Sequence, residues 1–346
     1  MAKRWIQAML VLGMALPAMA SAREQIRIVG SSTVFPFVAA AAEQFGRGGK
    51  FRTPIVEATG TGGGIKVFCS GVGDDYPDMV NASRHIKDSE IELCAKNGIA
   101  DITELKLGYD GIVLANARSS TSYALTRRIL FLALAREVPQ NGAMVANFYK
   151  RWNEIDPALP DAAIEIYGPP PSSGTRDAFT ELVMAEGCKL VPEIKKLVGD
   201  EKKLKQQCLA MREDGVFVEA GEDDNLIVQK LINNPNALGV FGYSFLESNM
   251  ALVKANSVDG VMPDYDAIES GRYHVARSLF VYVKNAHAQK VGGLREFAVE
   301  LSSDAATGED GYLAMKGLLP LSESDHQSVK RIAANLTPMA KKKPND

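Results

Sequence analysis

The 346-residue sequence has few of the residues that build metal sites. Histidine occurs only four times, at positions scattered along the chain: His85, His274, His287 and His326. No C-x-x-C or H-x-x-x-H spacing is present, and such spacings are typical of zinc sites. We therefore expect no metal and no other cofactor.

The nucleotide-binding glycine motifs are also missing. The glycine-rich stretch "GTGGGIKV" lacks the lysine and the hydroxyl that a P-loop needs at fixed positions, and Ile65 occupies the third glycine site of a G-x-G-x-x-G fingerprint. The formal net charge is only −3, so charge gives no reason to expect a nucleic-acid partner or an anionic membrane surface. An anionic ligand would have to be attracted locally.

No apolar run reaches the roughly 20 residues that a membrane-spanning helix needs. The N-terminus instead combines two basic residues, an apolar run from about Ile6 to Leu16, and small residues ending at Ala20 or Ala22. This three-part pattern is typical of a cleavable secretory signal, with a membrane anchor as the alternative. No cysteine near the cleavage site supports a lipoprotein anchor. We expect residues 1–22 to be removed and the mature chain to reach the periplasm.

The sequence contains only four cysteines: Cys69, Cys94, Cys188 and Cys208. An even number in an oxidising compartment is consistent with two disulfides, and three pairings are possible. We favour Cys69–Cys94 and Cys188–Cys208, because each pair joins near neighbours and neither ties together the two halves of the chain.

Short apolar strands alternate with helices in the first third of the chain. The expected strands are residues 25–32, 53–60, 78–84 and 105–117, and the expected helices are 34–46, 63–71 and 88–98. Gly46 lies near the end of the first helix, and Gly98 occupies a C′ position after the third. Such alternation predicts an α/β fold with a largely parallel sheet, whose ligands bind beyond the carboxyl ends of the strands.

The same alternation resumes after residue 120. Helices are expected over 127–137, 144–155 and 174–187, and a strand over 163–170. The later run "RSLFVYVKN" resembles "GIVLANA" in length and character, and if the two pair, the chain crosses twice between two lobes with a cleft between them. We expect residues 23–114 with 278–346 to form lobe 1, and residues 115–277 to form lobe 2.

Three loops with serine or threonine hydroxyls open helices: residues 31–33, 59–64 and 172–175. A helix N-terminus offers unpaired N–H donors and a positive partial charge. Simple capping by Ser and Thr is the alternative explanation for each loop. Three such loops at the strand-to-helix edge favour a small oxyanion held between the lobes.

Six stretches in this order resemble the periplasmic phosphate-binding proteins of ABC phosphate importers: "GSSTVFPF", "GTGGGIK", "NASRHI", "YDGIVLANA", "SSGTRDAF" and "EDDNLIVQKLINNPNALGVFGYSFLE". The motifs extend from residue 26 to about residue 285. The resemblance implies a type II periplasmic-binding-protein fold, in which two α/β lobes joined by two crossing strands close on one phosphate. It also implies delivery to a membrane permease powered by an ATPase, by a binding protein expected to be a monomer.

The resemblance assigns phosphate-binding roles to matching residues: Ser32, Thr33, the Val34 amide, Thr61, Ser83, Ser173, Gly174 and Thr175. Two positions depart from the family pattern. Arg84 stands where well-studied members have an aspartate, and Pro169 to Pro171 stand near the place of an arginine, with Arg176 following instead.

These departures change the charges expected at the site. Buried phosphate needs charge-assisted donors, which Arg84 and Arg176 could supply, although either could be a surface residue. The sequence then leaves undecided which residue accepts the phosphate proton. Asp110 is the first candidate, and Asp223 or Asp224 is the second.

Two other functions compete with phosphate binding. A phosphatase could use Ser173 or Thr61 as its nucleophile, but no base, metal or carboxylate cluster accompanies these hydroxyls. A binding protein for sulfate or molybdate would need a similar site. We expect a phosphate-binding protein that is not an enzyme.

Overall fold

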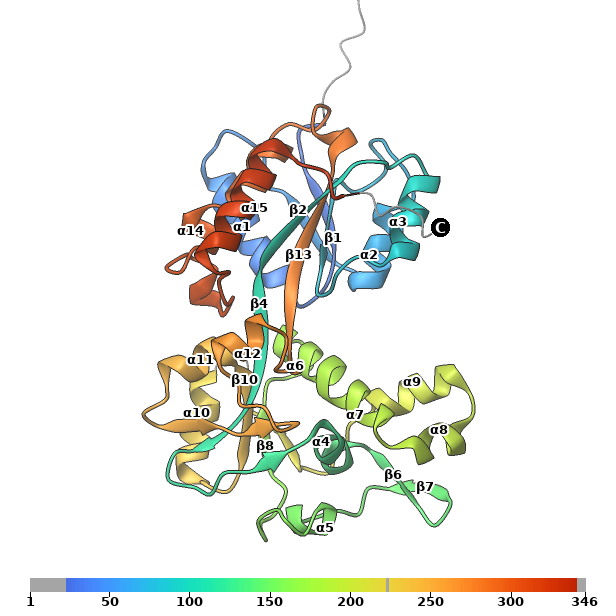
Figure 1. The fold of residues 1–346 in the computed structure, drawn as a ribbon, viewed down its shortest axis with the longest axis vertical. Helices are drawn as coiled ribbons and strands as arrows, with labels where there is room; N and C mark the ends of the chain where they lie inside the picture. The colour runs from blue at the N-terminus through green and yellow to red at the C-terminus, as the bar shows by residue number, and fades with distance from the viewer. Residues whose placement is uncertain (1–22, 222–223, 341–346) are drawn as a thin grey trace, which may run out of the picture.

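The computed structural model describes residues 23–221 and 224–340, so the expected signal sequence lies outside the described residues. Two lobes are joined by two long strands, β4 (Ile102–Ala117) and β13 (Ala276–Lys284) (Figure 1). These strands pair antiparallel, with Ala276 opposite Gly111 and Lys284 opposite Ile102. The expected pairing of the two apolar runs is confirmed, and the chain crosses twice between the lobes.

We call the upper part of Figure 1 the first lobe and the lower part the second lobe. Besides parts of β4 and β13, the first lobe contains β1 (Arg27–Gly30), α1 (Phe35–Arg47), β2 (Ile55–Ala58), α2 (Thr61–Phe68), β3 (Met79–Ala82), α3 (Asp88–Lys96), α13 (Leu294–Leu301), α14 (Asp304–Thr307), α15 (Glu323–Asn335) and the 3₁₀ turns Asn285–His287 and Ala314–Lys316.

The second lobe contains β5 (Ala124–Leu125), α4 (Arg127–Leu134), β6 (Glu137–Gln140), β7 (Ala143–Ala146), α5 (Trp152–Ile155), β8 (Ile166–Gly168), α6 (Gly174–Phe179), a π-helix (Thr180–Ala185), α7 (Glu186–Lys189), α8 (Pro192–Val198), α9 (Glu201–Leu209), β9 (Phe217–Glu219), α10 (Asp224–Asn233), β10 (Leu238–Gly242), α11 (Tyr243–Ser248), β11 (Val253–Ala255), β12 (Ser257–Val258) and α12 (Tyr265–Glu269). No described helix is long and apolar enough to cross a membrane.

One nine-stranded sheet runs through both lobes in the order β2-β1-β3-β13-β4-β10-β8-β9, with β11 also paired to β4. Strand β4 belongs to both lobes: its first part pairs with β13 as far as Gly111, and from Ile112 onward it pairs with β10 and then β11. Strands β13, β10 and β11 pair antiparallel with β4. Farther out on each side, β2, β1 and β3 pair parallel with one another, and so do β10, β8 and β9, as the alternation of strands and helices predicts. The partner of β4 therefore changes where the chain passes from one lobe to the other.

Most expected helices and strands are confirmed within a few residues of their predicted ends. Gly98 has a φ of +80°, so it supplies the left-handed C′ residue that the sequence predicts after α3. The helix expected over residues 174–187 is continuous but contains the π-helical stretch Thr180–Ala185 between α6 and α7.

The helix expected over residues 144–155 is wrong. Residues Ala143–Ala146 form strand β7, which pairs with β6, and only Trp152–Ile155 is helical. Asn141 and Gly142 both have positive φ, +50° and +80°, as the two-residue turn of a β-hairpin requires. The Asn-Gly pair was the overlooked signal, because it outweighs the helix-like spacing of the apolar residues that follow.

Both expected disulfides are confirmed, and each lies inside one lobe. Cys69 is bonded to Cys94 with Cα atoms 4.2 Å apart, and Cys188 is bonded to Cys208 with Cα atoms 5.4 Å apart. Neither bond joins the two lobes.

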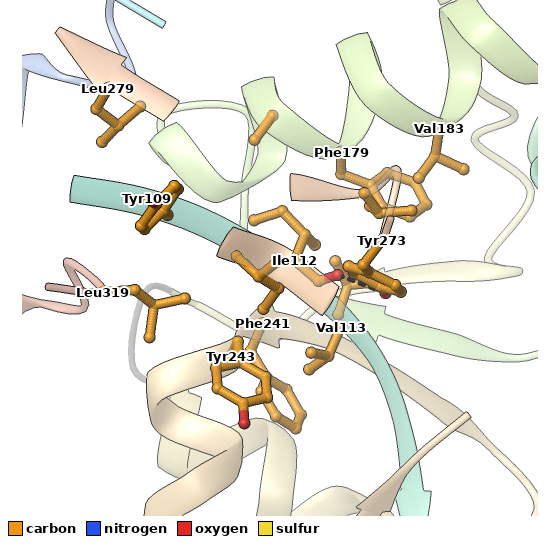
Figure 2. Packing of buried hydrophobic residues seen from close by; sticks show 14 of the residues in the cluster. Tyr109, Ile112, Val113, Phe179, Val183, Phe241, Tyr243, Tyr273, Leu279 and Leu319 are labelled. Carbon is orange, nitrogen blue, oxygen red and sulfur yellow. Dashed lines mark hydrogen bonds between the residues drawn. The ribbon is translucent and has the colours of Figure 1, made fainter. Parts of the chain in front are cut away.

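A hydrophobic core continues beneath the crossing strands. Figure 2 shows Tyr109 and Ile112 of β4 near Phe179 of α6 and Leu279 of β13, all of them buried. The Tyr273 hydroxyl donates a hydrogen bond of 2.8 Å to the Ile112 carbonyl in the same core. The two crossing strands are thus packed on apolar side chains.

Candidate functional site

Three strand ends of the first lobe lie side by side and carry polar loops. Gly30 of β1 is in register with Ala58 of β2 on one side and with Asn81 of β3 on the other. Because the three strands are parallel, the loops that follow them emerge at one edge of the sheet. Three segments are thereby brought together: the first loop (residues 31–33), the glycine loop (residues 59–64) and the "ASR" segment (residues 82–84).

The hydroxyls of the first loop do not cap helix α1. Val34 is the N-cap residue and makes no side-chain cap, while Thr33 is 5% exposed and Val34 is fully buried. The Ser32 Oγ instead donates a 2.5 Å hydrogen bond to Asp177 Oδ2, and the Thr33 Oγ1 accepts from Arg277. Simple capping therefore does not explain the Ser32 and Thr33 hydroxyls, which contact the second lobe and the crossing strand.

The glycine loop is shaped by close backbone approach. Gly60 has a φ of +75°, and a Cβ on Gly64 would lie 2.5 Å from the Cα of Gly30, so a side chain there would push α2 away from β1. Thr61 Oγ1 lies 3.1 Å from Ser83 Oγ and accepts a 3.2 Å hydrogen bond from the Ser83 N–H. Two predicted site residues, Thr61 and Ser83, are therefore in direct contact.

Arg84 lies beside this loop but is held by a neighbouring carboxylate. Its two terminal nitrogens donate to both oxygens of Glu90, at 2.9 and 2.8 Å. The hydrogen bond to Glu90 raises the pKa of Arg84; burial would raise the pKa of Glu90, but the bonds from Arg84 and the Lys87 N–H lower it. The positive charge of Arg84 is thus largely balanced within the first lobe.

The S-G-T loop of the second lobe packs directly on the first loop. A Cβ on Gly174 would lie 3.3 Å from the Cα of Thr33 and 3.7 Å from the Ser32 carbonyl oxygen. Ser173 is the N-cap of α6, and its Oγ accepts from the Thr175 N–H at 3.2 Å, so capping does explain this hydroxyl. The residues predicted from both lobes, Ser32 and Thr33 with Ser173 to Thr175, are brought together where the lobes meet.

Arg176 points into the second lobe. Its guanidinium lies 4.0 Å from the centre of the Phe217 ring and donates to the Pro169 carbonyl oxygen at 3.2 Å. Burial lowers the pKa of Arg176, and the charge of Glu219 opposes that effect. The side chain lines a cavity of about 480 Å³ within this lobe, and its described contacts do not include the first loop or Arg84.

A different arginine, Arg277, occupies the junction of the lobes. It is the second residue of β13, opposite Asp110 of β4, and its side chain is only 7% exposed. One terminal nitrogen donates to Thr33 Oγ1 and the other to Glu181 Oε2, each at 2.5 Å. Its Nε lies 3.5 Å from Asp110 Oδ2.

Sequence reasoning missed Arg277. The available signal was an arginine at the start of an otherwise apolar strand, "RSLFVYVK", expected to pair with the strand that contains Asp110. Burying an arginine there requires a carboxylate partner, but the register that supplies one is visible only in the structure.

Asp110 is a buried carboxylate whose Oδ2 is paired in charge with Arg277. Its side chain is 13% exposed, and Oδ2 accepts no hydrogen bond from the described residues. Burial raises the pKa of Asp110, and the nearby charge of Arg277 opposes the rise. Of the other acceptors considered, Asp224 begins α10 and Asp223 lies outside the described residues.

Nothing in the described ranges groups three or more histidine, cysteine or acidic side chains in a way that could hold a metal ion. The junction offers groups of the kind that can bind an anion. It combines two hydroxyls, helix N-termini and a buried guanidinium with a carboxylate behind it.

A family model for the PBP superfamily domain matches residues 17–305 of the chain. The chain is 32% identical to protein SphX of Synechocystis sp. over 320 residues, which are 89% of this chain and 83% of that protein. It is 30% identical over 294 residues to the phosphate-binding protein PstS of Staphylococcus saprophyticus, covering 83% of this chain and 79% of the relative.

The structure is similar to that of a possible phosphate binding protein from Planctomyces limnophilus, with a TM-score of 0.73, 26% identity, and coverage of 91% of this chain and 99% of the other. An ABC-type phosphate transport receptor from Vibrio cholerae shares the fold, at a TM-score of 0.56 and 18% identity over 86% of this chain and all of that one.

Two lobes that meet at a polar junction, with two strands crossing between them, define a substrate-binding protein of the type II fold. The chain belongs to the PBP superfamily, in the family that includes PstS and SphX. The resemblance to periplasmic phosphate-binding proteins is confirmed at the level of the family and the fold.

Proposed function

We propose that this protein binds inorganic phosphate between its lobes and delivers it to the permease of an ABC importer, without catalysing a reaction. The relatives named for phosphate binding support the ligand. The observation that carries the proposal is the meeting of Thr33, Gly174 and Arg277 at one point between the lobes.

The proposed ligand contacts come from both lobes. Ser32, Thr33 and the Val34 amide would donate from the first loop, and Thr61 with Ser83 from the neighbouring loops. The second lobe would donate through the Gly174 N–H at the start of α6, and through the Thr175 N–H once it exchanged Ser173 Oγ for the ligand. A small oxyanion can accept from all of these donors at once, whereas a flat or extended ligand cannot.

Charge compensation would come first from Arg277. Phosphate near neutral pH carries roughly one to two negative charges, and burying it needs charge-assisted donors. Arg277 is nearly buried and touches a predicted ligand residue. Arg84 is paired with Glu90, so we assign it a smaller part, and we assign Arg176 the smallest because it stacks on Phe217.

We propose Asp110 as the group that selects a protonated anion. A carboxylate can accept a hydrogen bond from phosphate that retains a proton, whereas it repels sulfate, which has none at neutral pH. The burial of Asp110 beside Arg277, at the junction of the lobes, supports this assignment over Asp224.

The lobes would act as two units that close on the ligand. We propose residues 23–114 with 278–346 as one unit and 115–277 as the other. In support, β4 exchanges β13 for β10 near the first boundary, between Gly111 and Ile112, and Arg277 stands at the second boundary. Removal of residues 1–22 on export would place a monomer outside the cytoplasm, where the importer's binding proteins act.

Calorimetric titration of the mature chain tests the function directly. We expect phosphate to bind with a stoichiometry near one and sulfate and molybdate to bind much more weakly. A parallel assay should find no release of phosphate from phosphate esters. Binding of sulfate or molybdate alone would establish the alternative oxyanion function, and turnover of an ester would contradict the non-enzymatic role.

A further inference from the structure

Two carboxylates of the second lobe accept hydrogen bonds from groups that are proposed to donate to the bound anion. Asp177 Oδ2 accepts from Ser32 Oγ, and Glu181 Oε2 accepts from a terminal nitrogen of Arg277, both at 2.5 Å. The two acidic residues are four positions apart on the continuous helix formed by α6 and the π-helix. Residues at this spacing share one face of a helix, and here that face is turned to the junction between the lobes.

The two carboxylate partners of Arg277 differ in how easily they can leave it. Asp110 is 13% exposed and fixed in the crossing strand, whereas the Glu181 side chain is 64% exposed. An exposed carboxylate that leaves an arginine regains its hydration at little cost, while a buried one does not. Glu181 is therefore the displaceable partner and Asp110 the permanent one.

Glu181 also acts on the other arginine of this region. Its negative charge contributes, after the larger effects of Glu90, to raising the pKa of Arg84 in the first lobe. A carboxylate of the second lobe thus lies in the field of both first-lobe and crossing-strand cations. A phosphate oxygen that bound the same donors would occupy the same positions and carry the same charge.

We propose that Asp177 and Glu181 are ligand-mimicking carboxylates, which hold the donors of the site and must be displaced by the incoming anion. This inference rests on the proposed phosphate function. Their competition lowers the affinity for phosphate and for any other oxyanion by the same factor, since the carboxylates leave whatever the anion is. Asp177 and Glu181 thereby set the range of phosphate concentrations over which the site fills. They do not change its preference for one anion over another.

The test is calorimetric titration of the wild-type mature chain and of Glu181→Gln with phosphate and with sulfate. Loss of an exposed ion pair and of one negative charge near the anion should tighten phosphate binding about three- to ten-fold. Sulfate binding, where measurable, should tighten by a similar factor. Asp177→Asn, which keeps a hydrogen-bond acceptor for Ser32, should also tighten binding.

Glu186→Gln is the matched control. Glu186 lies on the same continuous helix, but its carboxylate pairs with Lys189, at 2.6 Å between Oε1 and Nζ. The control should bind phosphate with wild-type affinity.

The outcomes separate the two proposals. A wild-type chain that binds no phosphate contradicts the proposed function, and this inference with it. A wild-type chain that binds phosphate, with unchanged or weaker binding in Glu181→Gln, overturns this inference alone. Weaker binding in Asp177→Asn would instead make Asp177 a ligand contact and remove it from the competing pair.

Discussion

Two pairs of side chains at the junction divide into donors on one side and carboxylate acceptors on the other. The first lobe and the crossing strand present donors, through Ser32 and Arg277, while the helix of the second lobe presents acceptors, through Asp177 and Glu181. The lobes thus hold each other with the same groups that the proposed anion would use. When the proposed anion binds, Ser32 and Arg277 would each exchange a carboxylate partner for an anion oxygen. They would make no additional polar contact.

The lobes also differ in how they bury charge. In the first lobe, both members of the Asp78–His287 pair are almost fully buried, at 2.6 Å, and Arg23 adds a second partner to Asp78. In the second lobe, Arg212 is 3% exposed but its partner Asp214 is 40% exposed. The first lobe therefore buries both members of its charge pair, whereas the second lobe leaves one member partly exposed.

The largest expected effect is on the donor side of the junction. Arg277→Ala should weaken phosphate binding by roughly 100-fold or more, because it removes a buried charged donor and leaves Asp110 unpaired. Calorimetry measures the affinity, and urea unfolding measures the accompanying loss of stability. Arg272→Ala, at an exposed arginine shortly before β13, is the control. A less than three-fold loss in a folded Arg277→Ala protein would contradict the central place given to Arg277.

The two disulfides allow the stability of the lobes to be compared. Replacing Cys69 and Cys94 by serine should lower the free energy of unfolding by about 3 kcal/mol, and so should the same change at Cys188 and Cys208, since the sequence separations of 25 and 20 residues are similar. Urea unfolding monitored by circular dichroism measures both. Phosphate affinity should be unchanged in each folded variant, and its loss in either would connect the disulfide to the site.

A smaller effect concerns the buried lysine of the first lobe. Lys284 is fully buried and donates to the Gly71 carbonyl oxygen at 2.7 Å, and burial lowers its pKa from 10.5 to about 8. Between these values the unfolded chain binds more protons than the folded chain, so the free energy of unfolding should rise with pH. We expect a rise of about 2 kcal/mol from pH 8 to pH 10, relative to Lys284→Met.

Urea unfolding of both proteins at several pH values measures this difference. Other groups that titrate in the range are common to the two proteins and cancel in the comparison. Parallel pH profiles would show that Lys284 keeps its proton throughout, and would contradict the lowered pKa of this buried lysine.

The smallest expected effect is on selectivity. Asp110→Asn should lower the preference for phosphate over sulfate by about ten-fold, because an amide no longer repels an anion that lacks a proton. Titration with both anions at one pH and salt concentration measures the ratio. Arg84→Ala is the control, since loss of a cation should weaken both anions together. An unchanged ratio in Asp110→Asn would move the search for the proton acceptor to Asp223 and Asp224.

Much of the fold could be predicted because local signals agreed with the tertiary structure. Apolar alternation located the parallel strands of the first lobe, and Gly98 correctly marked the end of α3. The β6–β7 hairpin was missed because two local signals conflicted there. The turn at Asn141 and Gly142 determines the structure. Its positive φ angles are those of a hairpin turn, so the residues directly after it continue as a strand and do not begin a helix.

The candidate site was less predictable for a physical reason. Ser32, Thr33 and Gly174 lie next to local motifs, so the sequence indicates them directly. Arg277 belongs to no such motif, and it reaches the site only because β13 pairs with β4 in a register that sets it opposite Asp110, more than 160 positions earlier. A one-residue shift in that register would turn the side chain to the other face of the sheet.

The position of β13 also has a consequence for the order in which the chain can fold during synthesis. This strand lies between β3 and β4 in the first-lobe sheet, yet it follows the whole second lobe in the sequence. Until residues 276–284 have left the ribosome, β3 and β4 have no strand to join them. A nascent chain that ends before Ala276 can complete the inserted second lobe but not the first, so half of the proposed binding surface forms only at the end of translation or after it.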